Sequence, residues 1–446
     1  MSGAAIARES GPEASRPRPT TGRAALARTA RGERSGPGTT TSPRSSAGGA
    51  GSSAQLPRLA LAGNRAVTAL LTVSRQEETT EATGTAPDTT VAPEPAATPL
   101  LDAAGIARAR QYYTAQPDRY PPAILTQLRS AVGLAPEGGV DDALVLAVAR
   151  WQSTEGAASP ALVVDGMAGP RTLPRIFASG LNTAGEAESF GGDVQSEVVD
   201  EWATLATPAA RRDRLVELVN QRLTAAGVPP VTAAADPNPV NSGSFDFTVW
   251  VMLVGDGALG GGEITQEAAA DVADTVYHEA RHTEQWFRMA QYRASQGLSA
   301  AGIAAELGIP VAIARLARAA PLAAGSPLAL IARGWWDSVY GGGAEHRERV
   351  LAEVDAAARA RDAAGAAHAG DPTPANQAAL DAATERFERA HDAYQNLPEE
   401  NDAWATGPAA AAGITSGSPP PTDAPAGSPP ASGGPAHDAL PEENLP

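Results

Sequence analysis

The sequence contains no cysteine, and its 34 basic residues are all arginine. Without cysteine there are no disulfide bonds, thiolate metal ligands or cysteine nucleophiles, so a metal ion would have to be bound by His, Asp or Glu. An excess of positive charge is also missing, because 51 acidic residues give a net charge of -17. A general nucleic-acid-binding protein needs a basic face that displaces counterions. The composition therefore argues against that class.

Long apolar stretches are missing as well. No part of the chain approaches the roughly 20 apolar residues of a membrane-spanning helix, and residues 1–15 lack the apolar core of a secretory signal. We therefore expect a soluble protein without a membrane span that is made in the cytoplasm. Its export would need a route other than a signal peptide.

Three segments have compositions typical of unfolded chain. Residues 1–54 mix Arg, Ser, Gly, Thr and Pro without periodicity, residues 77–99 form a Pro/Thr-rich linker, and residues 406–446 are acidic and rich in Pro, Gly and Ser. Such segments cannot bury enough apolar surface to offset the loss of chain entropy. We expect disordered tails at both ends and folded segments between them.

The remaining sequence predicts a mainly α-helical protein. Over 100–180, "AILTQLRSAVGL" and "DDALVLAVARWQ" each place apolar residues on one stripe, which predicts a small three-helix domain. Over 194–405 we expect an α+β domain with a small sheet and long helices. In this domain "SFDFTVWVMLVG" predicts one strand, and 264–296 predicts an amphipathic helix. Residues 344–369 and 374–394 predict an antiparallel helical hairpin.

The stretch "VYHEARHTEQWF" lies in the middle of the predicted long helix and contains two of the six histidines. On a helix, His278 and His282 lie one turn apart on the same face, so both imidazoles can bind one metal ion. A catalytic zinc needs three protein ligands and an open position for water, and Glu279 is placed to remove a proton from that water. With this composition, about 0.01 matches to H-E-x-x-H are expected by chance. The alternative is a polar helix face that binds no metal.

The segment "YHEARHTEQ" resembles the zinc-binding helix of zincin metallopeptidases, especially the forms with an apolar or small residue and a Gln following the second histidine. In gluzincin-like members a glutamate on a later helix completes the site, in a stretch similar to Tyr, Asn, Pro, x, Glu, x, x, Ala. The stretch "YQNLPEENDAW" fits this pattern, except that Leu397 stands between the Asn and the Pro. The resemblance therefore implies Glu400 as the third ligand. Glu345, His346 and Glu348 are the competing candidates.

Peptide hydrolysis also needs a donor that stabilises a developing oxyanion. Tyr340, Tyr394 and Arg281 are available for this role. The sequence does not choose among them, and a tyrosine on an Ala-rich helix is more often part of a core than of an active site.

The stretch "VVDGMAGPRTLPRIF" resembles the second half of peptidoglycan-binding domains, in which Asp165, Gly166, Gly169, Pro170 and Thr172 form a turn that leads into a helix. The preceding "ALVLAVARWQ" matches the helix before that turn. The first Asp-Gly element of such domains is replaced here by Asp-Asp-Ala, which weakens the case for glycan binding. The resemblance implies a three-helix fold, and a simple helical spacer is the alternative.

Residues 55–76 contain "LPRLALAGNRAVTALL", which is similar to a segment of bacterial proteins associated with extracellular contractile injection systems. In those proteins a leucine-rich lead precedes Gly-Asn-Arg-Ala-Val, found here at 63–67. Such proteins are loaded as cargo or attached to the particle, and they often carry H-E-x-x-H domains. The resemblance implies delivery by an injection particle, and an ordinary amphipathic helix is the alternative.

These features together predict a zinc metallopeptidase-like effector or cargo of a contractile injection system. His278, His282 and Glu400 would bind Zn2+, and Glu279 would act as the general base on a peptide or protein substrate. One alternative is a cell-wall peptidase that the helical domain directs to peptidoglycan. Another is a non-enzymatic component of the particle in which the histidine helix is structural.

Overall fold

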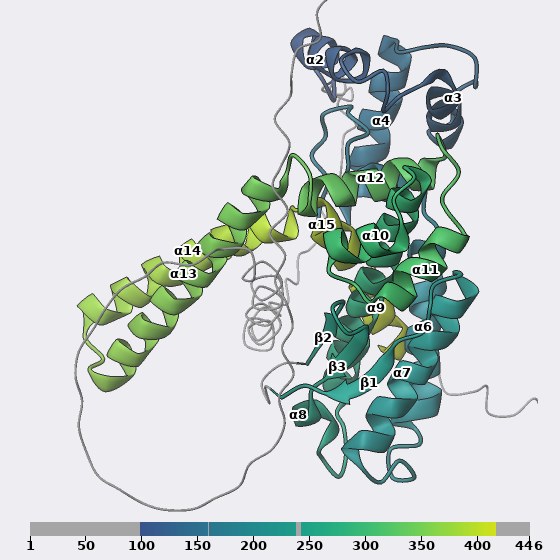
Figure 1. Cartoon of the computed structure of the whole chain (residues 1–446). Coiled ribbons are helices and arrows are strands. Elements are labelled where there is room, and N and C mark those ends of the chain that lie inside the picture. Colours follow the sequence, from purple (N-terminus) through teal and green to yellow (C-terminus); the bar gives the residue numbers. More distant parts are fainter. Residues whose placement is uncertain (1–98, 159, 238–241, 416–446) are drawn as a thin grey trace, which may run out of the picture. The chain divides into compact units, whose positions relative to one another are not determined.

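The computed structural model of the chain describes residues 99–158, 160–237 and 242–415. This part is mainly helical and contains one three-stranded sheet (Figure 1), so the mainly α fold expected from the sequence is confirmed. None of the described helices combines the length and the apolar character needed to cross a bilayer. The predicted tail over 1–54, the injection-system segment over 55–76 and nearly all of the linker that follows lie outside the described residues.

The described part of the chain begins with three helices, namely α2 (Ala103–Thr114), α3 (Pro122–Ala131) and α4 (Asp142–Thr154). Two of them begin at an aspartate cap, because Asp102 and Asp141 each accept a hydrogen bond from the backbone N–H three residues later, at 2.6 and 2.8 Å. Their apolar stripes meet in a common core in which Tyr113, Leu128 and Leu144 are buried. The helices predicted within 100–180 are therefore present.

The predicted turn after α4 is also present. Gly166 has a φ of 72°, a conformation that favours glycine, and its N–H donates to Oε1 of Gln152 at 2.8 Å. The same glutamine donates to Oδ1 of Asp165 at 2.9 Å and to the carbonyl of Met167 at 3.1 Å. The chain then continues into the short helix α5 (Leu173–Ile176). One buried glutamine on α4 thus holds the turn in place.

The sheet contains three short strands, namely β1 (Thr232–Ala235), β2 (Gly243–Asp246) and β3 (Val251–Val254). β1 pairs in parallel with β3, and β2 pairs antiparallel with β3, so the strand order is β1-β3-β2. This order makes β2 an edge strand, and β2 packs against the long helix α9.

The single strand predicted over 244–255 is wrong, because the chain reverses within it. Oδ1 of Asp246 accepts a hydrogen bond from the N–H of Thr248 at 2.9 Å, and Trp250 adopts a left-handed φ of 62°. An aspartate that bonds the backbone two residues later is typical of a turn. The surrounding aromatic and β-branched residues hid this signal in the sequence.

The long helix α9 (Gln266–Ser295) begins where the Thr265 side chain accepts a hydrogen bond from the N–H of Ala268 at 3.2 Å. Its length agrees with the prediction for 264–296, but every residue from Val276 to Gln291 is buried. The polar side of this stretch is therefore buried as well as the apolar side, because helices and the sheet cover it on all sides. The charged residues inside it must find partners within the protein.

The remaining helices of this region surround α9, and most of them contact it directly. They are α6 (Glu186–Val194), α7 (Pro208–Ala225), α8 (Asp256–Leu259), α10 (Ala300–Leu307), α11 (Val311–Ala319) and α12 (Pro327–Val339).

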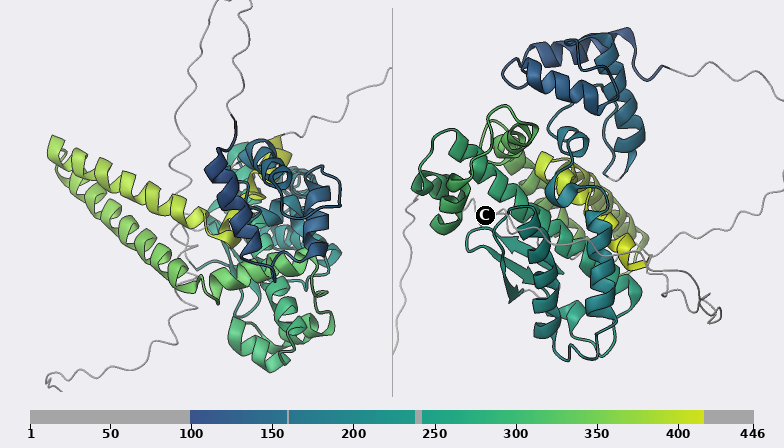
Figure 2. Two further views of the ribbon diagram at one scale, coloured as in Figure 1. Left: turned by 90° about the horizontal axis from the view of Figure 1, so that it is seen from above. Right: turned by 90° about the vertical axis from the view of Figure 1, so that its right-hand side faces the viewer.

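The predicted helical hairpin is confirmed. α13 (Ala344–Gly370) and α14 (Pro374–Gln395) lie side by side in Figure 1 and in both views of Figure 2. They share a small core of their own, in which Val354 and Phe387 are buried. α14 is followed at once by α15 (Pro398–Trp404), which packs against α9 and α12.

The tail predicted over 406–446 is wrong for its first residues. Its first residues form α16 (Gly407–Thr415), which packs against α6 and α9. At the crossing with α6, Gly413 lies against Gly191, and no space remains for a side chain on either glycine. The small residues that suggested disorder instead allow two helices to approach closely. Residues 416–446 lie outside the described part of the chain.

Candidate metal centre

α9 and α15 bring together the two histidines and the glutamate identified in the sequence. The Nε2 atoms of His278 and His282 are 3.0 Å apart, and Oε2 of Glu400 lies 3.8 Å from the first and 3.3 Å from the second. All three residues are buried, and the group could hold a metal ion. A circle through these three atoms has a radius of about 2.0 Å, which matches the roughly 2.0–2.2 Å between zinc and its nitrogen or oxygen ligands.

The junction between α14 and α15 places Glu400. Leu397 is buried in the core of the hairpin, and Pro398 occupies the first position of α15, where proline favours helix initiation. Leu397, the residue that departs from the gluzincin-like pattern, therefore anchors the start of the helix that carries Glu400. The competing candidates are exposed on α13 and do not belong to the cluster, namely Glu345, His346 and Glu348.

Most of the buried acids around the histidines are paired with arginine. Glu284 binds Arg281 at 2.5 Å, Glu399 binds Arg347 at 2.7 Å, and Asp402 binds Arg281 at 2.9 Å. Within the described part of the chain, Glu279 and Glu400 are buried beside the imidazoles without an arginine partner. When both are ionised they place two negative charges in the interior, and the single proton on the histidine pair balances only one of them. This balance favours a divalent cation, because a buried charge is costly unless it is paired.

Two further contacts orient His282 and Glu400. Nδ1 of His282 lies 2.8 Å from Oε1 of Gln285, and the hydroxyl of Tyr394 forms a hydrogen bond with the carboxylate of Glu400. Oε2 of Glu400 is buried and makes no hydrogen bond of good geometry in the described part of the chain, although it faces both Nε2 atoms. A metal ion between these three atoms would satisfy that oxygen.

Without a metal ion, the charges of the cluster shift its own pKa values. Burial alone would lower the pKa of His282, but the carboxylates of Glu400 and Glu279 outweigh it and raise the pKa to about 9. Burial, and then the charge of His282, lowers the pKa of His278 to about 3. Burial would raise the pKa of Glu400, yet the two imidazoles lower it to about 2. At neutral pH His282 is therefore protonated and His278 is neutral. The proton on His282 supplies positive charge that a bound metal ion would otherwise supply.

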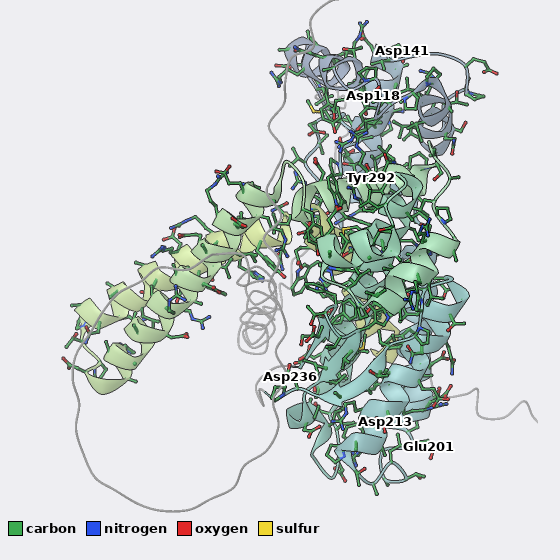
Figure 3. All side chains as sticks on the ribbon, in the orientation of Figure 1. Asp118, Asp141, Glu201, Asp213, Asp236 and Tyr292 are labelled. Carbon is green, nitrogen blue, oxygen red and sulfur yellow. The ribbon has the colours of Figure 1, made fainter. Side chains whose placement is uncertain are left out.

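Glu279 points toward the sheet. Its Oε2 accepts a hydrogen bond from the backbone N–H of Phe245 on the edge strand β2 at 2.8 Å. Burial raises the pKa of Glu279 to about 7; the charge of His282 opposes this increase, and those of Glu400 and Asp236 add to it. Asp236 directly follows β1 and is labelled in Figure 3. A carboxyl group with this pKa can take up and release a proton near neutral pH.

The cluster is nearly closed to solvent. The side chains of His278, His282 and Glu400 expose 8, 2 and 1% of their surface. The ring of Trp404, at the end of α15, lies 4.8 Å from that of His278, and the residue is itself partly exposed. Trp404 therefore covers the ligand that lies nearest to solvent.

The three oxyanion donors considered from the sequence are already engaged. The hydroxyl of Tyr340 accepts a hydrogen bond from Nε1 of Trp286 at 3.2 Å and donates to the carbonyl of Leu307 at 2.9 Å. Tyr394 bonds Glu400, and Arg281 pairs with two buried carboxylates. None of these three residues presents an unengaged donor to the cluster in this conformation.

The Gln that follows the second histidine in the zincin-like pattern is Gln285, and its spacing of three residues from His282 places both on one helix face. Two other residues that contact the cluster, Phe245 and Trp404, could not be identified from the sequence. Phe245 contributes only a backbone N–H, and Trp404 approaches from another helix, so no local pattern could have identified them.

Comparisons with known proteins do not assign a function: no family model, no curated protein and no solved structure matches this chain. The case for a function therefore depends on the geometry of the cluster and on the resemblances in the sequence.

Proposed function

We propose that this chain is a zinc-dependent metallopeptidase. The observation that carries the proposal is the buried cluster of two imidazoles and one carboxylate, with a further buried carboxyl, Glu279, beside it. Three protein ligands leave one coordination position for water or substrate, which is typical of catalytic zinc sites, whereas structural sites usually have four protein ligands. Imidazole and carboxylate ligands at these separations suit zinc.

Zinc, when bound, acts as a Lewis acid and lowers the pKa of water. His278, His282 and Glu400 would hold the ion. Glu279 would take up a proton from the attacking water and pass it to the leaving amine. Its Oε2 is held by the N–H of Phe245, so Oε1 is the atom that would carry the proton. A pKa of about 7 supports both halves of this transfer near neutral pH.

We propose a peptide or protein as the substrate. Glu279 contacts β2, which is an edge strand of the sheet. An edge strand can pair with an extended peptide through backbone hydrogen bonds, and here a substrate would displace Glu279 from the N–H of Phe245. This arrangement supports a substrate that lies in extended form beside the cluster.

Two parts of the proposal concern where the enzyme acts. The similarity of residues 63–67 to injection-system proteins supports delivery by a contractile particle. The likeness of 163–177 to peptidoglycan-binding domains supports the alternative of a cell-wall peptidase. Sedimentation of the full chain with purified sacculi, compared with sacculi stripped of stem peptides, would show whether the chain binds the cell wall, as the second alternative requires.

A second candidate function is a structural metal site in a non-enzymatic protein. The observation that favours it is the near closure of the cluster, since a catalytic ion must meet its substrate. In that case the chain would bind zinc but would not hydrolyse any peptide, and replacement of Glu279 would change nothing but stability.

The decisive experiment measures the zinc content of the purified full chain and its hydrolysis of a peptide library. We expect about one zinc per chain, lost in His278→Ala and kept in His346→Ala, which removes an exposed histidine of α13. A wild type that contains no zinc after incubation with the ion would exclude both candidates. If the wild type and Glu279→Gln both bind zinc and neither hydrolyses any peptide, the structural site is favoured.

A further inference from the structure

Gln285 connects the two helices that supply the cluster. It lies on α9 one turn after His282 and is fully buried. Its Oε1 is 2.8 Å from Nδ1 of His282, and its Nε2 donates to the carbonyl oxygen of Glu399 and to Oδ2 of Asp402, each at 2.8 Å. Glu399 precedes Glu400 on α15. One amide therefore contacts a candidate ligand on α9 and the backbone next to a candidate ligand on α15.

The two acceptors on α15 determine which way this amide points. A carbonyl oxygen and a carboxylate both require a donor, so Nε2 of Gln285 faces them and Oε1 faces His282. Because an amide oxygen only accepts, Nδ1 of His282 carries a proton, and the lone pair of the neutral imidazole is on Nε2. That Nε2 lies 3.0 Å from Nε2 of His278 and 3.3 Å from Oε2 of Glu400. The imidazole is thus held in the tautomer that can bind a metal ion there.

We propose that Gln285 is a positioning residue of the metal centre, which fixes the tautomer of His282 and holds α15 so that Glu400 stays in the cluster. This inference rests on the proposed metal site, but it does not depend on the hydrolytic reaction. Residues that orient metal ligands typically contribute about 10–100-fold to metal affinity. Gln285 acts on two of the three candidate ligands at once.

The chemistry of the site requires an amide at this position. A glutamate at position 285 could still accept a hydrogen bond from His282, but its second oxygen would face the carbonyl of Glu399 and the carboxylate of Asp402. All of these groups are acceptors, so α15 would be pushed away and Glu400 with it. A methionine has a similar length and makes neither contact. Gln285→Met therefore removes both contacts, whereas Gln285→Glu removes only the contact with α15.

The test compares the zinc affinity of the full-length wild type with that of Gln285→Met, Gln285→Glu and Gln291→Met, by competition with a chelator. Gln291 is the matched control, because it is also a buried glutamine on α9. It donates to the carbonyl of Ala320 at 2.7 Å and accepts from Arg288 at 2.9 Å, away from the cluster. Both Gln285 variants should bind zinc about 10–100-fold more weakly, and Gln291→Met should stay within about threefold of the wild type.

Two outcomes distinguish the failure of this inference from the failure of the metal site. Equal zinc affinity in the wild type and both Gln285 variants overturns the role of Gln285 and leaves the site intact. A wild type that binds no zinc overturns the site, and the role of Gln285 with it.

A measurement on the wild type keeps the proposal testable if the variants do not fold. The imidazole nitrogen chemical shifts of the zinc-loaded protein should show His282 protonated at Nδ1 and metal-bound at Nε2. Protonation at Nε2 overturns the proposed tautomer and hence the role of Gln285.

Discussion

Replacement of Glu279 by glutamine separates the proposed base from the metal ligands. Glutamine has nearly the same shape, and its oxygen can still accept the hydrogen bond from the N–H of Phe245. It cannot take up a proton, so peptide hydrolysis by the zinc-loaded protein should fall by about 10²–10⁴-fold. The zinc content should remain that of the wild type, because Glu279 is not one of the three clustered ligands.

The same substitution should change how the stability of the metal-free protein depends on pH. Burial raises the pKa of Glu279 from 4.5 to about 7, so the folded state keeps a proton that the unfolded chain releases above pH 4.5. The wild type therefore has the full contribution of this group below pH 4.5 and loses it as the pH rises through 7. At about 1.4 kcal/mol for each pKa unit, the loss reaches about 3 kcal/mol. Glutamine does not titrate, so the variant avoids this loss.

Urea unfolding of both proteins in the presence of a chelator, at pH 4.5 and at about pH 8, measures this difference. The free energy of unfolding of Glu279→Gln, relative to the wild type, should increase by about 3 kcal/mol between the two pH values. A packing difference that does not depend on pH cancels in this comparison. Glu345→Gln is the control, because that side chain is 84% exposed. An identical pH dependence in wild type and variant, together with unchanged hydrolysis, would refute the assignment of Glu279 as a buried base.

Other perturbations test the centre and its surroundings. Zinc at about 1,000 times its dissociation constant should stabilise the fold by about 4 kcal/mol, and an unchanged Tm in calorimetry with and without zinc would contradict an ion at this site. Trp404→Ala should release zinc to a chelator several times faster, because the ring covers His278; an unchanged release rate would show that the ring is no barrier. Gly413→Ala should lower the free energy of unfolding in urea by about 1–3 kcal/mol, because a Cβ there overlaps the carbonyl oxygen of Glu188. Gln152→Leu should lower it by about 2–4 kcal/mol, because the polar groups of the turn lose their partners. The zinc affinity should not change in this last variant, and a change would indicate that the turn influences the metal centre.

The predictions that the structure corrects have different physical origins. The strand predicted over 244–255 is interrupted by a local turn at Asp246 and becomes two paired strands, β2 and β3. The helix predicted over 264–296 is present as α9, but its charged residues form buried pairs such as Arg281 with Asp402. The glycine- and alanine-rich stretch 407–415 suggested a tail, but it packs closely against α6. In the last two cases the partner that changes the outcome comes from a distant part of the chain.

Local sequence determined the long helix and the relative placement of its two histidines. The cap at Thr265 and the helical pattern that follows suffice for α9. A spacing of four residues puts His278 and His282 on one face of any regular helix, whatever surrounds it. The same is true of the turn at Gly166, where the conformation depends on the residue itself.

Tertiary structure alone decided which acid joins the histidines. Glu345, His346, Glu348 and Glu400 all had the right chemistry, and only the docking of α15 on α9 brings Glu400 to the imidazoles. That docking depends on the hairpin core, on buried ion pairs and on the amide of Gln285, which are contacts between distant segments. Helix geometry is a property of a few consecutive residues, whereas a third ligand is positioned by the packing of the whole domain.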